Sequence, residues 1–412
     1  PGSPGPARYH LHGPPPHVFL RARHRYATLT VMSKGRVVVA MSGGVDSSVA
    51  ALLLQQQGYE VVGVTMRLWT LERPNVRVGR TCCSIEDVDD ARRVCQMLGV
   101  RHYFQNFERE FQEHVVDYFV REYDRGRTPH PCLACNDKIK FDFLLRRSMF
   151  LDADFIATGH YARVRNDGER YRLLTGIDES KDQSYVLFML GQSELSRLLL
   201  PVGEYPKSEI RSIASDAGLL VADKPDSQEI CFIPNNDYRE FVADRTRSRP
   251  GDFVDSSGNV IGKHEGIQHF TIGQRRGLGL PGNTGEPIYV TRIVAEANQV
   301  VLGPRHELDQ LRLWASRVNY VSGFAPVGPM QVTAKIRYKS MHAAATLTPG
   351  DGAAELKFDS PQRAVTPGQA VAFYDGEEVV GGGIIETTPP ADAAPKEGQV
   401  HDGLQRHHTA RV

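Results

Sequence analysis

The stretch Arg36-Val-Val-Val-Ala-Met-Ser-Gly-Gly-Val-Asp-Ser-Ser48 decides the fold. Its opening residues form an apolar, β-branched run that predicts a buried strand, and the spacing from Ser47 to Gln57 predicts a helix. The two glycines between them let the backbone approach an anion at the positive end of the helix dipole. The stretch therefore predicts a phosphate-binding loop, although the Gly-Lys-[Ser/Thr] of a Walker loop is absent. An ordinary Ser/Gly turn with a helix cap is the alternative interpretation.

The alternation of strand and helix continues beyond this loop. Apolar strand patterns recur at residues 60–66, 102–107 and 154–158, with helical patterns between them at 84–98 and 111–123. Strands separated by helices predict an α/β fold with a doubly wound parallel sheet. The active crevice of such a sheet lies at the carboxyl ends of its strands.

The pattern of the chain changes near residue 233. Helical periodicity fades there, and short alternating segments with Gly, Pro and Asn turns predict a β-rich half. We expect a small central β-rich domain and a C-terminal domain resembling a β-barrel. The expected organisation is a disordered leader at 1–35, a phosphate-loop catalytic domain at 36–233, the central domain at 234–302, the barrel-like domain at 303–388 and a disordered tail at 389–412.

Composition excludes several classes of protein. The chain has 412 residues, of which 41% are hydrophobic and 24% charged, as in a globular chain of two to three domains. No apolar run approaches the roughly 20 residues of a membrane span. Lys and Arg total 49, as do Asp and Glu, and zero net charge argues against a general polyanion binder. Six cysteines are too few for a disulfide scaffold, so we expect a reducing, cytoplasmic location.

The leader is rich in proline and contains no acidic residue. An organellar transit peptide would share the lack of acids, but it would be Ser-rich and amphipathic. We therefore interpret residues 1–31 as a remnant of a mis-assigned start, with Met32 as the natural first residue.

Three cysteines stand in patterns that indicate chemistry. Cys132 and Cys135 form a CxxC after two prolines, and we expect them in a loop before a helix that begins near Asp137. The helix start and two following lysines would favour the thiolate. Cys231 lies in a segment leading to the β-rich half, and its contact with Cys135 requires that segment to fold over the sheet. The pattern indicates a redox, metal-binding or nucleophilic function for these cysteines, and a purely structural role is the alternative interpretation.

Basic residues gather in the β-rich half. Residues 310–350 contain no acidic residue, and their tyrosines are available to stack on unpaired bases. This stretch indicates a nucleic-acid contact surface, with solvated strand faces as the alternative. The basic residues in it are Arg312, Arg317, Lys335, Arg337 and Lys339.

The order of further segments makes a family resemblance specific. The phosphate loop is similar to that of the PP-loop ATP pyrophosphatases, which adenylate a substrate oxygen and release pyrophosphate. The later segments are Thr128-Pro-His-Pro-Cys-Leu-Ala-Cys-Asn-Asp-Lys-Ile-Lys-Phe141, Ala157-Thr-Gly-His-Tyr161, Lys181-Asp-Gln-Ser-Tyr185, Asp226-Ser-Gln-Glu-Ile-Cys-Phe-Ile233, His269-Phe-Thr-Ile-Gly-Gln-Arg-Arg-Gly-Leu278 and Val365-Thr-Pro-Gly-Gln369. Together they closely resemble the tRNA-specific 2-thiouridylases of the MnmA type, from about Val37 to Thr388.

The resemblance implies 2-thiolation of the wobble uridine in the anticodon stem-loop of tRNA. ATP would adenylate the uracil C2 oxygen, and sulfur would displace AMP, giving 2-thiouridine, AMP and pyrophosphate. Cys135 is implied as the nucleophile and Cys231 as the carrier of a persulfide that a sulfur-relay donor protein delivers. The alternative mechanism uses Cys132, Cys135 and Cys231 as ligands of an iron–sulfur cluster. We expect Mg²⁺ with the ATP, no protein-bound metal, no membrane partner and a monomer.

The resemblance also assigns ligand contacts to individual residues. ATP contacts are implied for Ala40, Met41, Ser42, Gly43, Gly44, Val45, Asp46, Ser47, Met66 and Gly159. His130, Pro131 and Cys132 are implied to approach the target base, and tRNA contacts are implied for His160, Lys181, Asp182, Gln183, Arg337, Tyr338 and Gln369. The sequence departs from the family at two positions, because many members have Asn in place of His130 and some have Asp in place of Cys132.

Three rival functions fit part of the sequence. A PP-loop ligase acting on a small metabolite explains the phosphate loop but leaves the paired cysteines unused. A lysidine ligase of tRNA has no need of those cysteines either. A nucleic-acid-binding β module with a vestigial nucleotide domain conflicts with the intact phosphate loop.

Overall fold

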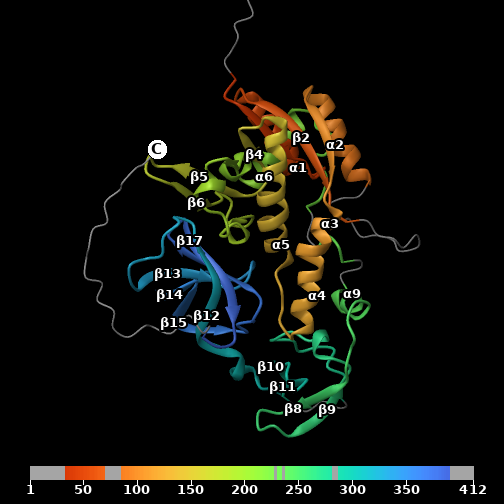
Figure 1. The fold of residues 1–412 in the computed structure, drawn as a ribbon, viewed down its shortest axis with the longest axis vertical. Helices are drawn as coiled ribbons and strands as arrows, with labels where there is room; N and C mark the ends of the chain where they lie inside the picture. The colour runs from red at the N-terminus through yellow and green to blue at the C-terminus, as the bar shows by residue number, and fades with distance from the viewer. Residues whose placement is uncertain (1–32, 70–84, 227–229, 234–236, 281–285, 390–412) are drawn as a thin grey trace, which may run out of the picture. The chain divides into compact units, whose positions relative to one another are not determined.

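The computed structural model describes residues 33–69, 85–226, 230–233, 237–280 and 286–389 (Figure 1). These residues build a five-stranded, a four-stranded and an eight-stranded sheet. In the described part of the chain, no helix is both long enough and apolar enough to span a bilayer.

The five-stranded sheet is parallel, with the strand order β3-β2-β1-β4-β7. The chain runs from β1 outward through β2 to β3 and then crosses back to β4 on the other side of β1, so the strand order reverses between β1 and β4. The crevice of the fold lies beyond the carboxyl ends of these two strands. The predicted doubly wound α/β sheet is thereby confirmed. Its strands are β1 (Arg36–Ala40), β2 (Glu60–Arg67), β3 (Arg101–Asn106), β4 (Phe155–Ala157) and β7 (Leu198–Leu199).

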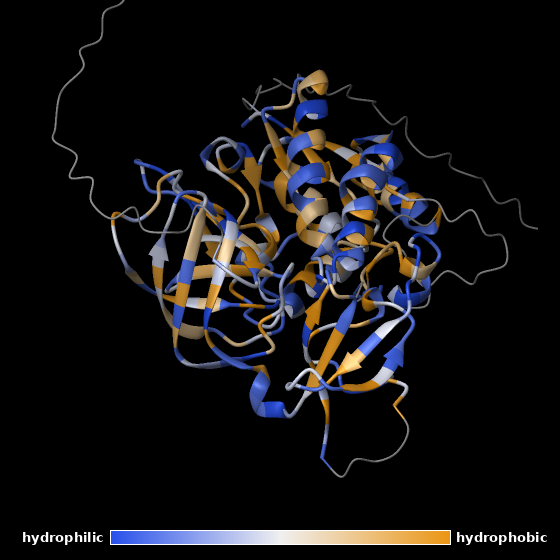
Figure 2. Cartoon of the chain, turned by 60° about the horizontal axis from the view of Figure 1, so that its bottom comes forward, coloured by the Kyte–Doolittle hydropathy of each residue, from blue (hydrophilic) through white to orange (hydrophobic). Residues whose placement is uncertain are grey.

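Helices cover both faces of this sheet, because successive side chains of a strand point to opposite sides. Val37 and Val39 of β1 pack in one core with α1 (Val45–Gln56), α2 (Ile85–Leu98) and α8 (Lys207–Asp216). Figure 2 shows both hydrophilic and hydrophobic residues along the helices, as expected for helices that have buried and exposed positions.

Two long helices pack on the opposite face, in the core that contains Val38 and Ala40. The first runs through α3 (Glu108–Phe111), a π-helical segment (Gln112–Val116) and α4 (Asp117–Asp124). The second, here called the cysteine helix, runs through α5 (Pro131–Ala134), a π-helical segment (Cys135–Phe143), α6 (Leu144–Ser148) and a 3-10 turn (Met149–Leu151).

The cysteine helix begins earlier than its sequence suggests. We expected Cys132 and Cys135 in a loop before a helix starting near Asp137, and this is wrong, since both lie in the first turns of the helix. Pro131 occupies the first helical position, where its missing N–H costs nothing and its fixed φ suits a helix. His130 caps the helix, because its Nδ1 accepts a hydrogen bond from the backbone N–H of Leu133 at 3.2 Å.

The four-stranded sheet follows the order β10-β11-β8-β9 and has Phe253, Phe270 and Val300 in its core. It confirms a β-rich region after the parallel sheet. Its strands are β8 (Gly251–Val254), β9 (Val260–His264), β10 (Tyr289–Val294) and β11 (Gln299–Gly303), and α9 (Tyr238–Ala243) precedes them.

Six strands of the third sheet close into an antiparallel barrel, because β12 pairs with both β15 and β17. The predicted barrel-like architecture is therefore confirmed. These strands are β12 (Asp309–Tyr320), β13 (Met330–Lys335), β14 (Ala343–Pro349), β15 (Ala353–Arg363), β16 (Ala370–Asp375) and β17 (Glu378–Glu386). The hairpin of β5 (Ala162–Asn166) and β6 (Tyr171–Thr175) extends the sheet through β17. Short helical segments elsewhere are Ser184–Val186, α7 (Gln192–Leu195), Pro201–Glu204, Ile267–His269 and Arg305–Leu308.

Polar contacts attach the barrel to the segment that enters the cysteine helix. The guanidinium of Arg127 donates to Glu122 in α4 at 2.7 Å and to both carboxylate oxygens of Glu386 in β17. The side-chain amide of Gln369 donates to the carbonyls of Thr128 and Pro129, at 3.1 Å each. The barrel thus holds the chain immediately before His130.

Substituting Arg127→Met should lower the free energy of unfolding by about 2–3 kcal/mol, because it removes the cation from the partly buried Glu386 carboxylate and leaves Glu122 only the more distant Arg125. Urea denaturation measures this loss. Arg312→Met is the matched control, since its ion pair with Glu355 is exposed, with side-chain exposures of 56% and 32%, and should cost under about 0.5 kcal/mol. Equal effects of the two substitutions would contradict the role given to Arg127.

Candidate functional site

The phosphate loop is a tight backbone structure at the carboxyl end of β1. Gly43 has a φ of +71°, and a Cβ at that position would collide with the carbonyl oxygen of Asp87. The Ser47 hydroxyl accepts a hydrogen bond from the backbone N–H of Ser42 at 3.2 Å, and the Ser48 hydroxyl donates to the Gly44 carbonyl at 2.8 Å. Glycine is therefore required at position 43 by both its φ and its surroundings.

A second glycine brings the end of β4 against this loop. A Cβ on Gly159 would lie 2.7 Å from the backbone nitrogen of Ser47 and 2.8 Å from the carbonyl carbon of Asp46. Ala40 ends β1, and Met66 lies near the end of the adjacent strand β2, each 9% exposed. The residues with predicted ATP contacts are thus gathered at the carboxyl ends of β1, β2 and β4.

Asp46 is held by two side chains from other parts of the chain. It accepts hydrogen bonds from the Tyr161 hydroxyl at 2.7 Å and from the Lys207 ammonium at 2.7 and 2.9 Å. Burial and the Asp46 carboxylate raise the pKa of Tyr161 far above its usual value, so that its hydroxyl stays protonated and donates. The carboxylate of the phosphate loop is therefore fixed in place before any ligand binds.

Asp226 collects three cations around one carboxylate. The side chains of Lys181, Lys207 and Arg211 each place a nitrogen 2.9 Å from it. Burial would raise the pKa of Asp226, but the hydrogen bonds from Lys181 and Lys207 outweigh it and bring the pKa to about 2. The Asp226 carboxylate is consequently ionised at any physiological pH.

Sequence reasoning missed two lysines at this site. Lys207 is only 8% exposed and joins Asp46 to Asp226. Lys224 donates to the Gly43 carbonyl at 2.9 Å and pairs with Asp87 and Asp90 in α2. Lys224 stands just before the segment from Asp226 that the sequence singled out, but no spacing rule links either lysine to the phosphate loop.

The two predicted sulfur-transfer cysteines share one hydrophobic core. Cys135 is 9% exposed within the core of the long helices, and half-buried Cys231 packs against the same core. Phe232, next to Cys231, is buried against the rings of Phe111 and Phe119 with centroids 5.6 and 5.3 Å away. The segment carrying Cys231 therefore lies on the face of the sheet that the two long helices cover, as its proposed contact with Cys135 requires.

Four of the residues predicted to approach or contact the RNA, His130, Cys132, Tyr338 and Gln369, lie around the start of the cysteine helix. The ring centroid of His130 is 5.6 Å from that of Tyr185, which in turn is 6.4 Å from that of Tyr338. Gln369 binds the carbonyls just before His130. Cys132 is exposed in the first turn of the same helix.

Other predicted RNA contacts are engaged inside the protein. Asp182 and His160 are 6% and 7% exposed, and Asp182 accepts hydrogen bonds from the Gly176 and Ser184 backbone. The side-chain oxygen of Gln183 accepts from the Tyr161 N–H at 3.0 Å. Asp182 and Gln183 thus fix the segment that follows Lys181, whereas His160 is hydrogen-bonded to Thr158. Arg337 remains exposed, with one guanidinium nitrogen donating to the Arg363 carbonyl.

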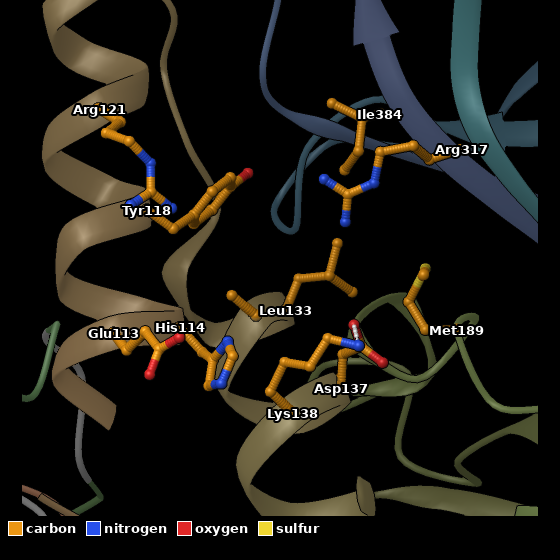
Figure 3. A pocket seen from close by; sticks show the side chains of 11 residues that line it. Glu113, His114, Tyr118, Arg121, Leu133, Asp137, Lys138, Met189, Arg317 and Ile384 are labelled. Atoms are coloured by element: carbon orange, nitrogen blue, oxygen red, sulfur yellow. Dashed lines mark ion pairs between the residues drawn. The ribbon is translucent and has the colours of Figure 1, made fainter. Parts of the chain in front are cut away.

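A separate pocket opens between α4, the cysteine helix and the barrel (Figure 3). Arg121, Lys138 and Arg317 bring positive charge to it, and Lys138 also pairs with Asp137 at 3.3 Å. Of its lining residues, Arg317 belongs to the basic stretch predicted to contact nucleic acid, and none has a predicted ATP contact. The pocket is adjacent to the cysteines through Leu133 and Ala134 without including them.

Comparison with known proteins agrees with this arrangement. Family models match residues 35–235 as a tRNA methyl transferase HUP domain, 239–304 as a tRNA methyl transferase PRC-barrel domain and 310–385 as an aminomethyltransferase beta-barrel domain. A tRNA-specific 2-thiouridylase MnmA 2 of Caldanaerobacter subterraneus is 51% identical over 86% of this chain and 99% of its own length. The chain belongs to the MnmA family of tRNA-specific 2-thiouridylases.

Further relatives of this thiouridylase family are similarly close. The MnmA of Acetivibrio thermocellus is 49% identical over 86% of this chain and 100% of its own length. A solved 4-thiouridine synthetase–RNA complex with bound ATP has a TM-score of 0.31 and 18% identity, covering 51% of this chain and 50% of that one. A likeness that weak carries no argument about the site.

The iron–sulfur alternative gains no support from the geometry. Within the described ranges, no group of three or more His, Cys, Asp and Glu side chains is placed to hold a metal ion. The three cysteines at 132, 135 and 231 are among the side chains covered by this statement, so their placement does not favour a cluster.

In this thiouridylase family member, the His130 cap makes a pH-dependent contribution to stability. Burial lowers the pKa of His130 to about 4, so below its unfolded value of about 6.5 the unfolded chain binds a proton that the folded chain does not. The contribution is complete above about pH 6.5 and is lost as the pH falls toward about 4.

His130→Asn should remove this dependence while keeping an acceptor for the Leu133 N–H. From pH 7 to pH 5, the wild type should lose about 1–2 kcal/mol more unfolding free energy than the variant. Urea denaturation at both pH values measures the difference. Other buried histidines such as His160 contribute equally to both proteins and cancel. Identical pH profiles would show that the His130 ring is not the titrating cap.

Proposed function

We propose that this protein thiolates C2 of the wobble uridine of tRNA, using ATP to activate the C2 oxygen. One observation carries the proposal: the phosphate loop and the core shared by Cys135 and Cys231 lie on the same parallel sheet of an MnmA-type chain. The loop accounts for activation and the cysteines account for delivery of sulfur.

ATP is proposed to bind at the loop of residues 40–47, against Gly159 and Met66. Gly43 and Gly44 have no side chains, so a phosphate can approach their backbone closely. The positive end of the α1 dipole lies at the same place and favours an anion. Mg²⁺ is proposed to arrive with ATP, held mainly by the phosphates, because the described residues form no metal cluster of their own. Asp46 is the carboxylate of the loop beside it.

The chemistry replaces a poor leaving group with a good one. The uracil C2 oxygen attacks the α-phosphorus of ATP, and pyrophosphate departs. The terminal sulfur of a Cys231 persulfide then either attacks C2 directly or is released as hydrosulfide when the Cys135 thiolate attacks the inner sulfur. In the direct route AMP leaves C2 as the carbon–sulfur bond forms, and the Cys135 thiolate then attacks the Cys231 sulfur, breaking the S–S bond and leaving the transferred sulfur on C2. In the second route the released hydrosulfide attacks C2 and displaces AMP. Both routes leave a Cys135–Cys231 disulfide, which a dithiol reductant restores to two thiols.

The RNA is proposed to approach the start of the cysteine helix. Exposed Tyr338 offers a ring face there, with buried Tyr185 behind it, and exposed Arg337 offers charge for the backbone. Cys132 in the first helical turn is proposed to lie beside the target base. Internal bonds at Asp182 and Gln183 favour a role in fixing the segment that follows Lys181.

Several finer points belong to the same proposal. The sulfur is proposed to come from a persulfide donor protein of a sulfur relay, since the chemistry consumes one sulfane sulfur in each cycle. We also propose that the protein works as a monomer in the cytoplasm. The proposed division into domains is 36–233, 234–302 and 303–388, between a leader at 1–35 and a tail at 389–412.

Cys135→Ser and Cys231→Ser should each abolish thiolation while leaving ATP affinity within about twofold, because neither side chain belongs to the phosphate loop. The assay combines protein, ATP, tRNA and a persulfide donor, and detects 2-thiouridine by retarded migration in a mercury gel. Cys95→Ser is the matched control, as Cys95 lies in the core on the other face of the sheet. Full activity of Cys231→Ser would disprove its role as carrier.

Asp46→Ala should slow tRNA-dependent release of pyrophosphate at least about tenfold, equivalent to about 1.4 kcal/mol of activation free energy. The loss follows because Lys207 and Tyr161 would no longer be fixed against the loop. Asp216→Ala, at an exposed site ending α8, should leave the rate unchanged. Release of pyrophosphate with a small metabolite in place of tRNA, without thiolation, would favour the rival ligase.

A further inference from the structure

Asp46 of the phosphate loop is connected to the segment Lys181–Gln183 along two paths. In the first, Asp46 accepts from the Tyr161 hydroxyl, while the backbone of Tyr161 exchanges hydrogen bonds with Gln183. In the second, Asp46 binds Lys207, Lys207 binds Asp226, and Asp226 binds Lys181. Both ends of the predicted RNA-contacting triplet are therefore tied to one carboxylate of the predicted ATP site.

The second path, here called the charge network, consists of Asp46, Lys207, Asp226 and Lys181. Its central cation is buried, with the Lys207 side chain 9% exposed, whereas the Lys181 side chain is 38% exposed. Charges away from water interact more strongly than surface charges. A change of charge at Asp46 therefore alters the interaction between Lys207 and Asp226. Lys181 is the most exposed cation of the network, so it can leave Asp226 and bind a ligand in solvent.

Adding phosphate beside Asp46 has a definite consequence for this network. Lys207 is the ammonium in contact with Asp46, so the negative charge of a polyphosphate draws it toward the loop and weakens its hold on Asp226. Asp226 then depends more on its two remaining cations, Lys181 and Arg211, to balance its charge. Lys181 is correspondingly less available to an RNA phosphate, and the reverse holds when RNA draws Lys181 away from Asp226.

We propose that the charge network makes nucleoside triphosphate binding at the loop and RNA binding at Lys181 antagonistic, with Lys207 and Asp226 as positioning residues. This inference rests on the proposed function, which places ATP at the loop and tRNA at residues 181–183. Because coupling is reciprocal, RNA weakens the triphosphate by the same factor. Departure of pyrophosphate relieves the competition, so the adenylated RNA is held more tightly while sulfur is delivered.

The test measures tRNA affinity by filter binding, with and without a saturating non-hydrolysable ATP analogue. The analogue should weaken tRNA binding by about fivefold, and AMP should not. The logarithm of the tRNA association constant falls linearly with the logarithm of the salt concentration. With the analogue, this slope should decrease in magnitude by about one, as expected on loss of one phosphate contact. A purely structural role of the network would move neither quantity with nucleotide.

We define the coupling factor as the ratio of the tRNA dissociation constants with and without the ATP analogue. Asp226→Asn should bring this factor to one. Without nucleotide, its tRNA affinity should equal or exceed that of the wild type, since Asp226 no longer holds Lys181. Lys181→Gln should also remove the coupling, but with weaker tRNA binding. The matched control is Lys224→Gln, which cuts a contact of the loop with α2 outside the charge network and should keep the coupling factor despite weaker nucleotide binding.

The outcomes separate the two proposals. Failure of the wild type to bind either the analogue or tRNA overturns the proposed function. Binding of both with a factor of one, or with tighter tRNA binding, overturns the antagonism alone. Retention of the coupling in Asp226→Asn shows that it does not run through the charge network.

Discussion

The ion pair between Asp46 and Lys207 is the contact on which the arrangement of the site depends. Asp46 is the second residue of α1 and belongs to the phosphate loop, whereas Lys207 begins α8, and the two helices pack on the same face of the sheet. An ammonium so deeply buried is stable only when paired, because an uncompensated charge away from water costs several kcal/mol. The pairing therefore imposes one relative position on the loop, on α8 and on the Asp226 segment.

Close backbone approach is the second constraint on the site. Gly43 lies against Asp87, and Gly159 lies against the backbone of Asp46 and Ser47, so any side chain at either position would push the loop away from its neighbours. With Lys224 holding the Gly43 carbonyl, the loop is fixed by α2, by β4 and by α8 together. A phosphate-binding loop benefits from such fixing, because its amides need no rearrangement when the anion arrives.

The cysteine helix shows how a local pattern misleads when its tertiary partners are unknown. Prolines at 129 and 131 suggested a loop, yet Pro131 is well suited to the first position of a helix. What selects the helix is the cap at His130, together with the hold of Gln369 on the preceding carbonyls. The barrel, more than two hundred residues along the chain, thereby helps determine where the reactive helix begins.

The sequence by itself determined the α/β sheet, the phosphate loop, the β-rich half and the cysteines, because hydrophobic periodicity and glycine placement are local properties of the chain. It did not reveal Lys207 or Lys224 as partners of the loop. Nor did it reveal the internal hydrogen bonds of Asp182, Gln183 and His160, whose RNA contacts stay predictions. Only the tertiary structure decided those points. An ion pair or a buried hydrogen bond joins residues that packing brings together, and no spacing along the chain records that proximity.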